Sequence, residues 1–195
     1  MPIADRPESW PVTSSEDIHR DGWVVALRAD AVRVPGADGT GEGEPFRRLV
    51  VEHPGAAIVL AIDDDGQVLC LQQYRHPAQI SFVELPAGLC DEPGEDPLEV
   101  AKRELREEVE LAAAEWVHLA SVWASPGISA EQHHLYLARG LSPASRGDFA
   151  LHAEEAAMEV FRAPFDELHA AVLDGRIADS PIALALLLAR AKGLA

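Results

Sequence analysis

The stretch of residues 96–111 constrains the fold more than any other part of this sequence. Asp96 is a favourable N-cap and Pro97 suits the first helical position, so a helix is expected to begin there. Apolar residues recur at helical spacing at Leu98, Ala101, Leu105 and Val109. A stripe of this kind has to pack against other apolar side chains. The stretch is therefore predicted to be an amphipathic helix with one face in a core.

The remaining positions of this helix concentrate acids. Glu104 and Glu108 are four residues apart and share a face, and Glu107 lies on its flank. Like charges at this spacing destabilise a helix by roughly a few tenths of a kcal/mol, and acids near its C-terminus oppose the macrodipole at about 0.3–1 kcal/mol each. A divalent cation would reverse both effects, because hard cations prefer clustered carboxylate oxygens. From the residues alone, a solvated acidic face in an acidic protein is the alternative.

The segments before the helix favour strands. Residues 22–34 and 46–52 are rich in strand-forming residues, and a polar, Gly-rich connection between them indicates a hairpin. Residues 56–62 and 67–74 flank Asp63-Asp-Asp-Gly66, a turn signal between apolar runs. A second hairpin is therefore predicted.

The segments after the helix add three strands and two helices. Strands are predicted over residues 115–123, 133–138 and 158–162, and helices over residues 164–173 and from a Ser180 cap onward. The order of strands, helix, strands and helices favours an α+β fold, with a mixed sheet between helices, rather than a doubly wound one.

Composition and charge exclude several function classes. The net charge of −17 argues against nucleic-acid binding, which depends on clustered Lys and Arg. The longest apolar run, residues 182–189, is too short to cross a membrane, and the N-terminus has no apolar signal core. Cys70 and Cys90 favour reduced thiols in a cytoplasmic protein over a lone disulfide. A small phosphorylated ligand bound through divalent cations remains compatible with the charge.

The helix and the loop before it resemble the Nudix box, G-x5-E-x7-R-E-U-x-E-E-x-G-U, where U is aliphatic. The matching residues are Gly88-Leu-Cys-Asp-Glu-Pro-Gly-Glu95 and, seven residues later, Arg103-Glu-Leu-Arg-Glu-Glu-Val-Glu-Leu111. Two positions depart from the pattern. Six residues, not five, separate Gly88 from Glu95, and Glu110 stands at the late glycine. That glycine ends the helix at positive φ, where a Glu would cost roughly 1 kcal/mol.

Residues outside the box resemble the ADP-ribose pyrophosphatase branch of this family. They are Arg75-His-Pro, Glu84-Leu-Pro-Ala-Gly88, Ser125-Pro-Gly-Ile-Ser-Ala-Glu131 and Glu154-Glu-Ala-Ala-Met-Glu159. Pro126 stands sixteen residues after Glu110, about where this branch carries its marker proline. The resemblance runs from about residue 22 to the C-terminus and leaves the first twenty or so residues unassigned.

The resemblance implies a Nudix αβα sandwich, a mixed β-sheet between helices, with an N-terminal β-hairpin region. Residues 1–54 would form a β-rich segment that makes a homodimer by exchanging N-terminal strands and contributes to the partner's substrate pocket. Residues 55–195 would form the hydrolase domain. The implied activity is divalent-metal-dependent cleavage of the diphosphate of ADP-ribose, or a related nucleoside diphosphate sugar, to AMP and a sugar phosphate.

The resemblance also implies roles for individual residues. The Ala87 carbonyl, Glu104 and Glu108 would hold Mg²⁺, with Mn²⁺ as a possible substitute, and Glu107 would contribute directly or through water. Arg103 would orient Glu107 or Glu104, the alternative being an ordinary helix salt bridge.

A base and a substrate site are implied elsewhere. Glu154 or Glu155 would deprotonate the attacking water, with Glu154 favoured of the two, and an acidic surface loop is the alternative for both. Arg75, Glu84, Pro126 and Glu131 would contact the substrate, and the alternative for Arg75 is an interface residue. Two other functions stay open: hydrolysis of a different nucleoside diphosphate derivative, and a non-catalytic, nucleotide-sensing module of the same fold.

Overall fold

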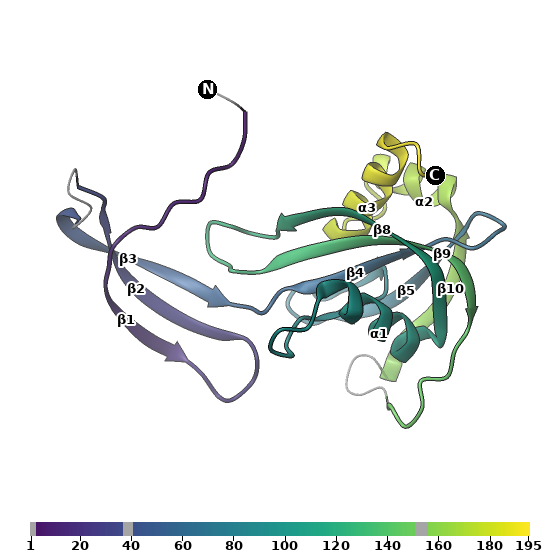
Figure 1. Ribbon diagram of the computed structural model, residues 1–195, viewed down its shortest axis with the longest axis horizontal. Helices are drawn as coiled ribbons and strands as arrows, with labels where there is room; N and C mark the ends of the chain where they lie inside the picture. The colour runs from purple at the N-terminus through teal and green to yellow at the C-terminus, as the bar shows by residue number, and fades with distance from the viewer. Residues whose placement is uncertain (1–2, 37–40, 151–155) are drawn as a thin grey trace. The chain divides into compact units, whose positions relative to one another are not determined.

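The computed structural model describes residues 3–36, 41–150 and 156–195, drawn in colour in Figure 1. The chain divides into two compact units. The first consists of Met1–Pro54 and Ala124–Glu131, and the second of Gly55–Trp123 and Gln132–Ala195. Each unit has its own sheet structure, and the two are described separately.

The first unit is built on a three-stranded antiparallel sheet in the order β1-β2-β3. Its strands are β1 (Val12–His19), β2 (Ala26–Val34) and β3 (Glu42–Glu52). The predicted hairpin of residues 22–34 and 46–52 is confirmed by the pairing of β2 with β3. Strand β1 lies in the segment that the sequence left unassigned, and all of its side chains are exposed. The hairpin region is therefore a three-stranded sheet.

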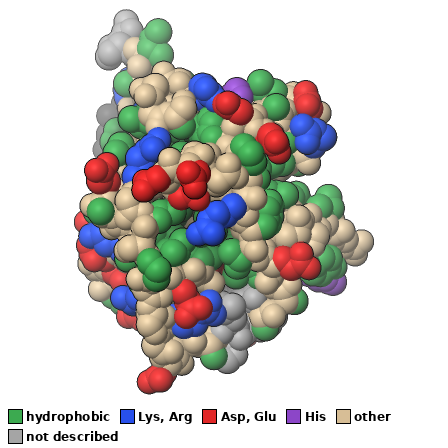
Figure 2. All heavy atoms as spheres, turned by 90° about the vertical axis from the view of Figure 1, so that its right-hand side faces the viewer, with side chains coloured by type: hydrophobic (Ala, Val, Ile, Leu, Met, Phe, Trp, Pro, Cys, Tyr) green, Lys and Arg blue, Asp and Glu red, His purple; other side chains and the backbone are tan. Residues whose placement is uncertain are grey.

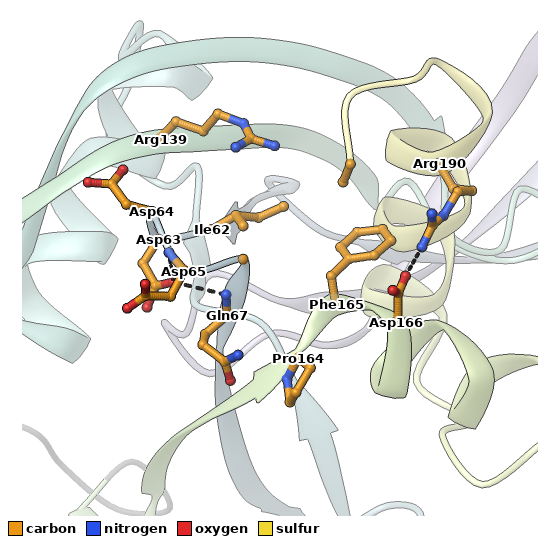
Figure 3. A pocket seen from close by; sticks show the side chains of 12 residues that line it. Ile62, Asp63, Asp64, Asp65, Gln67, Arg139, Pro164, Phe165, Asp166 and Arg190 are labelled. Atoms are coloured by element: carbon orange, nitrogen blue, oxygen red, sulfur yellow. Dashed lines mark hydrogen bonds and ion pairs between the residues drawn. The ribbon is translucent and has the colours of Figure 1, made fainter.

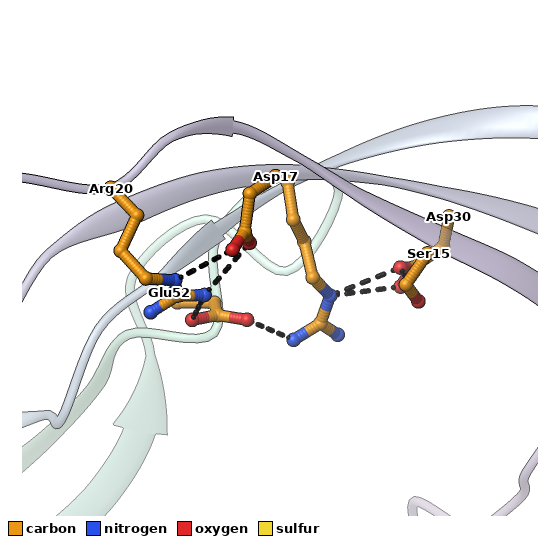
Figure 4. Close-up of polar contacts among 6 residues, drawn as sticks. Ser15, Asp17, Arg20, Asp30 and Glu52 are labelled. Atoms are coloured by element: carbon orange, nitrogen blue, oxygen red, sulfur yellow. Dashed lines mark hydrogen bonds and ion pairs between the residues drawn. The ribbon is translucent and has the colours of Figure 1, made fainter.

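A chain of ion pairs and hydrogen bonds crosses this sheet (Figure 4). It is formed by the side chains of Ser15, Asp17, Arg20, Arg28, Asp30 and Glu52. Arg28 Nε donates to Asp30 Oδ1 at 3.0 Å, and Arg20 Nη2 donates to Glu52 Oε2 at 2.6 Å. The hydroxyl of Ser15 donates to Asp30 and lowers the pKa of that carboxyl. These charges are thus largely paired with one another.

A mixed sheet in the order β7-β4-β9-β8 forms the centre of the second unit. Its strands are β4 (Ala56–Ala61), β7 (Ala87–Leu89), β8 (Leu111–Trp123) and β9 (Gln132–Pro143). Strand β4 runs parallel to β9, and the other pairs are antiparallel. A three-stranded antiparallel sheet in the order β10-β5-β6 completes the unit. It contains β5 (Gln67–Arg75), β6 (Ile80–Glu84) and β10 (Glu159–Pro164).

The predicted hairpin of residues 56–62 and 67–74 is wrong, although its turn is present. Asp63 and Gly66 close the turn through a backbone hydrogen bond of 3.0 Å. Strands β4 and β5 nevertheless belong to different sheets and share only the bridge between Ile62 and Val68. Both strands are buried along most of their length, and such strands need neighbours and packing on every side. The turn therefore passes the chain from one sheet to the other.

Within the residues that the structure describes, three helices pack on the two faces of this unit (Figure 1). They are α1 (Pro97–Val109), α2 (Phe165–Leu173) and α3 (Ser180–Ala191). Along β4, Ala57 and Val59 enter a core with α1, whereas Ile58 and Leu60 enter a core with α2 and α3. Because successive strand residues point to opposite faces, the sheet lies between helices. The expected αβα sandwich is confirmed.

The ends of the helices test the predicted caps. Asp96 accepts a hydrogen bond from the Leu98 amide at 2.8 Å, so the predicted cap of α1 is confirmed. The apolar stripe of α1 is confirmed as well, since Ala101 and Leu105 have no exposed surface. The N-cap of α3 is Asp179 rather than the predicted Ser180. Its longer carboxylate side chain reaches the Ile182 amide at 3.2 Å.

The structure also describes both cysteines and the lengths of the helices. Cys70 and Cys90 are free thiols, as predicted. Across the described ranges, every helix is too short or too polar to span a bilayer. Figure 2 shows one face of the molecule, on which Lys and Arg side chains lie among Asp and Glu rather than in a patch of their own.

Candidate active site

Two glutamates of α1, and a third just before the helix, gather around Arg103. Arg103 Nη1 lies 2.6 Å from Glu104 Oε1 and 3.2 Å from Glu107 Oε2, and its Nη2 lies 3.5 Å from Glu95 Oε2. Glu104 and Glu108 are only 8% and 5% exposed, although ionised carboxylates strongly prefer water. The helix thus holds two buried acids and a third beside them, as the spacing predicted.

The backbone of β7 meets these acids directly. The Ala87 amide donates to Glu108 Oε2 at 3.0 Å. A Cβ added to Gly88 would lie 1.9 Å from Cδ of Glu104, so only glycine allows the carboxylate to approach this closely. Pairing of β7 with β4 fixes this backbone in place, and α1 packs on the same sheet. The backbone of Ala87 and Gly88 is therefore in close contact with the buried carboxylates of Glu108 and Glu104.

These residues suit a divalent cation in their chemistry. Carboxylate and carbonyl oxygens are the hard ligands that Mg²⁺ and Mn²⁺ prefer, and Ala87, Glu104, Glu107 and Glu108 supply both kinds. Among the described His, Cys, Asp and Glu side chains, no group of three is arranged to hold a metal ion by itself. The guanidinium of Arg103 lies instead against Glu104 and Glu107 and compensates their charge. A cation would have to displace it from Glu104.

A second charged group in the same unit is formed by the last residue of β5 and the last residue of β6. Arg75 forms a bidentate pair with Glu84, with Nε 2.9 Å from Oε1 and Nη2 2.6 Å from Oε2. This pairing raises the pKa of Arg75, and the Asp179 and Glu108 carboxylates add to the effect. Burial raises the pKa of the Asp179 carboxyl to about 6, and the charge of Glu84 adds to that rise. Glu84, Asp179 and Glu108 are thus all within electrostatic reach of Arg75.

The C-terminal end of α1 carries the departure from the box pattern. Glu110 adopts φ 55° and ψ 40°, the left-handed conformation that the box glycine normally provides. A residue with a Cβ is strained there by roughly 1 kcal/mol. The helix therefore ends as the pattern requires, with a side chain that costs stability.

The other predicted site residues lie outside this group. Pro126 and Glu131 belong to the first unit, where Glu131 Oε1 lies 3.8 Å from His53 Nε2. Glu154 and Glu155, the predicted bases, lie outside the described residues. Sequence reasoning did not select Asp179. Its position two residues before Pro181 is typical of a helix N-cap and was the available signal.

A hollow of about 410 Å³ lies elsewhere in the second unit (Figure 3). Its lining comes from the turn after β4, the interior of β9, the end of β10, and helices α2 and α3. Arg139 donates to the Leu194 carbonyl, and Arg190 pairs with Asp166. Of the predicted site residues that the structure describes, none lines this hollow. The hollow therefore gives no support to the predicted chemistry.

Comparisons with known proteins agree with the box pattern. The NUDIX domain family matches residues 51–185. An ADP-ribose pyrophosphatase of Mycobacterium tuberculosis (strain ATCC 25618 / H37Rv) is 44% identical over 176 residues, which cover 90% of this chain and 80% of that protein. A methanol dehydrogenase activator of Bacillus methanolicus is 36% identical over 165 residues, which cover 85% and 84%.

A solved structure agrees at the level of the fold. The crystal structure of an ADP compounds hydrolase superposes with a TM-score of 0.73 at 21% identity, over 98% of each chain. The family match spans more than half of the chain, including β4 to β10 and all of α1. The resemblance drawn from Gly88, Glu95 and the acids of α1 is confirmed. This chain belongs to the Nudix family.

Proposed function

We propose that this chain hydrolyses the diphosphate of ADP-ribose, or of a closely related nucleoside diphosphate sugar, to AMP and a sugar phosphate. One observation carries the proposal: the buried carboxylates of Glu104 and Glu108 meet the backbone of Ala87 and Gly88. Burying two carboxylates is costly, and a divalent cation would add to the compensation that Arg103 gives Glu104. The 44% identity to an ADP-ribose pyrophosphatase supports ADP-ribose as the substrate.

The proposed cofactor is Mg²⁺, with Mn²⁺ as a substitute. The Ala87 carbonyl, Glu104 and Glu108 would hold it, and Glu107 would contribute directly or through water. When bound, the cation neutralises the diphosphate and stabilises the charge on the leaving oxygen. Arg103 orients Glu104 and Glu107 through the charge-assisted hydrogen bonds described above.

The reaction is the attack of a water molecule on one phosphorus atom of the diphosphate. A new P–O bond forms to the water oxygen, and the bond from that phosphorus to the bridging oxygen breaks. The water proton passes to a carboxylate that acts as general base. We assign this role to Glu154, with Glu155 as the alternative, on the resemblance of their segment to the acidic loop of the family.

Arg75, Glu84, Pro126 and Glu131 are the proposed substrate contacts. The side chain of Arg75 is 49% exposed, whereas that of Glu84 is only 8% exposed. Glu84 therefore holds the guanidinium from the protein side and leaves donors free to meet a phosphate oxygen. Glu131 would bind the terminal ribose, and Pro126 would shape the segment that carries it.

We propose that residues 1–54 form a homodimer by strand exchange and contribute to the substrate site of residues 55–195 in the partner subunit. In the sheet of the first unit only Ala26, Ala29 and Asp30 are buried. Apolar side chains on it remain exposed, among them Val12, Ile18 and Leu49. A three-stranded sheet with so little buried apolar surface needs a covering partner to be stable. Light scattering at micromolar concentration should give twice the chain mass.

Product analysis on ADP-ribose with Mg²⁺ tests the proposed reaction. Parent protein is compared with the Glu107→Gln and Glu108→Gln variants. AMP and ribose 5-phosphate should appear with the parent and be strongly reduced with both variants. Equal activity in all three would refute the assignment. Tight binding of ADP-ribose without turnover would favour a nucleotide-sensing module, and turnover of another nucleoside diphosphate derivative alone would reassign the substrate.

A further inference from the structure

The last turn of α1 is held by the segment that follows β9. Helix ends leave backbone carbonyls without intrahelical partners, and here two of these carbonyls are satisfied from outside the helix. The Ala144 amide donates to the Glu110 carbonyl at 2.8 Å. Arg146 Nη2 donates to the Glu108 carbonyl at 3.1 Å. The segment therefore contacts the helix beside one of its buried acids.

Arg146 also pairs with the residue that replaces the box glycine. Its Nη2 lies 3.5 Å from Glu110 Oε2, and the Arg146 side chain is only 24% exposed. Its Nε is buried and, within the part of the chain that the structure describes, has no hydrogen-bond partner. Burying most of an arginine costs free energy because the guanidinium loses water. We therefore interpret its two contacts with α1 as more than a surface ion pair.

Glu108 is consequently held at both ends. Its backbone carbonyl accepts from Arg146, and its carboxylate accepts from the Ala87 amide. We propose that Arg146 is a positioning residue: by fixing the last turn of α1 through Glu108 and Glu110, it holds the Glu108 carboxylate against the backbone of β7. The consequence for catalysis rests on the proposed function, because Glu108 is there a metal ligand.

The contacts of Arg146 also give Glu110 a structural role. A glycine would adopt the left-handed conformation without strain but would offer Arg146 no carboxylate. Glu110 supplies that carboxylate and keeps the positive charge of Arg146 near the helix C-terminus, where it favours the macrodipole. In this chain the Glu110–Arg146 pair thus restrains a helix end that glycine forms in the box pattern.

Amide hydrogen exchange tests the positioning role without substrate or metal. The variants are Arg146→Met, Arg146→Lys and, as a matched control, Arg162→Met, which removes an arginine paired with Asp63 at 3.4 Å. The Ala87 amide reports the hydrogen bond to Glu108, and the Val59 amide, bonded to the Pro86 carbonyl at 2.9 Å, reports the neighbouring backbone. Arg146→Met should speed exchange at Ala87 roughly tenfold and leave Val59 unchanged, whereas Arg146→Lys should retain part of the protection.

Calorimetric titration with Mn²⁺ extends the test to the site. Arg146→Met should weaken Mn²⁺ binding roughly tenfold, as the loss of a group that orients a ligand does, and Arg162→Met should bind like the parent. Equal exchange at Ala87 in all variants would overturn the positioning role. Faster exchange at both Ala87 and Val59 in both Arg146 variants would overturn it too, because it would show that the whole neighbouring backbone is destabilised. If exchange behaves as expected but the parent neither binds Mn²⁺ nor cleaves ADP-ribose, the proposed function fails and the structural restraint stands alone.

Discussion

Each of the two units contains a network of charged side chains, and the networks differ in how many carboxylates they hold for each arginine. In the first unit two arginines pair with three carboxylates: Arg20 and Arg28 with Asp17, Asp30 and Glu52 (Figure 4). In the second unit Arg103 contacts Glu95, Glu104 and Glu107, the half-exposed Arg106 lies 3.9 Å from Glu107, and the buried Glu108 brings the carboxylates to four. The first network joins strands of a sheet. The second keeps an excess of negative charge among buried residues, which a divalent cation would balance.

The largest expected effect comes from removing one charge in each network. Glu108→Gln should reduce Mn²⁺ affinity and ADP-ribose hydrolysis by roughly a hundredfold or more, because a ligand is lost rather than a group that orients one. Glu52→Gln removes a carboxylate of the first network and should leave Mn²⁺ affinity unchanged. Calorimetry on both variants checks this. An equal loss of affinity in the two would erase the distinction between the networks.

A smaller effect is expected from filling the space beside Glu104. Gly88→Ala places a Cβ 1.9 Å from the Glu104 carboxylate carbon, so the carboxylate has to move. Mn²⁺ affinity should fall roughly tenfold. Gly127→Ala is the control, because its Cβ would meet nothing within 4 Å and its backbone is not left-handed. Parent-like Mn²⁺ binding by Gly88→Ala would show that the close approach is unimportant.

Asp179 tests whether the excess of negative charge extends beyond α1. Burial raises its pKa to about 6 from an ordinary value of 3.8, and the nearby Glu84 adds to the rise. Between these values the folded chain binds more protons than the unfolded chain, so the free energy of unfolding falls as the pH rises through this window. Asp179→Asn still caps α3 and should stabilise the protein by roughly 1–2 kcal/mol at neutral pH.

Urea unfolding of Asp179→Asn and the parent at pH 4 and pH 7 measures this difference. The advantage of the variant should be large at pH 7 and shrink toward pH 4, where Asp179 is protonated in the folded chain. If Asp179→Asn were more stable than the parent by the same amount at both pH values, the charge of Asp179 would not be the cause.

The smallest expected effect concerns the helix end. Glu110→Gly relieves the left-handed strain but loses the pair with Arg146, so the free energy of unfolding should rise by about 0.5–1 kcal/mol. Urea unfolding checks the change. If the variant were instead less stable than the parent, the Glu110–Arg146 pair would contribute more to the free energy of unfolding than a partly exposed ion pair usually does.

The site helix was predictable because its signals are local. The Asp96 cap, the apolar stripe and the spacing of Glu104 and Glu108 all follow from helix geometry within sixteen residues. The αβα layering followed from the order of elements and from the family resemblance. Residue types, their spacing and the family resemblance were therefore enough to predict the fold class and the arrangement of acids on α1.

Long-range contacts were not predictable in the same way. The turn at Asp63 indicated a hairpin, yet β4 and β5 separate because each finds other strand partners. Asp179 reaches the electrostatic neighbourhood of Arg75 from a helix about a hundred residues further along the chain. Arg146 meets Glu108 across 38 positions. No periodic pattern links such residues, so only the tertiary structure brings them together.

Calorimetric titration of the parent protein with Mg²⁺ and Mn²⁺, with and without ADP-ribose, tests the central claim most directly. The claim is that the surplus carboxylates of α1 form a site for a divalent cation. Saturable binding at millimolar concentration or tighter is predicted, with AMP released only in the presence of the cation. Absence of binding in both conditions would contradict the claim and leave the glutamates of α1 as a network of ion pairs with Arg103 and Arg106.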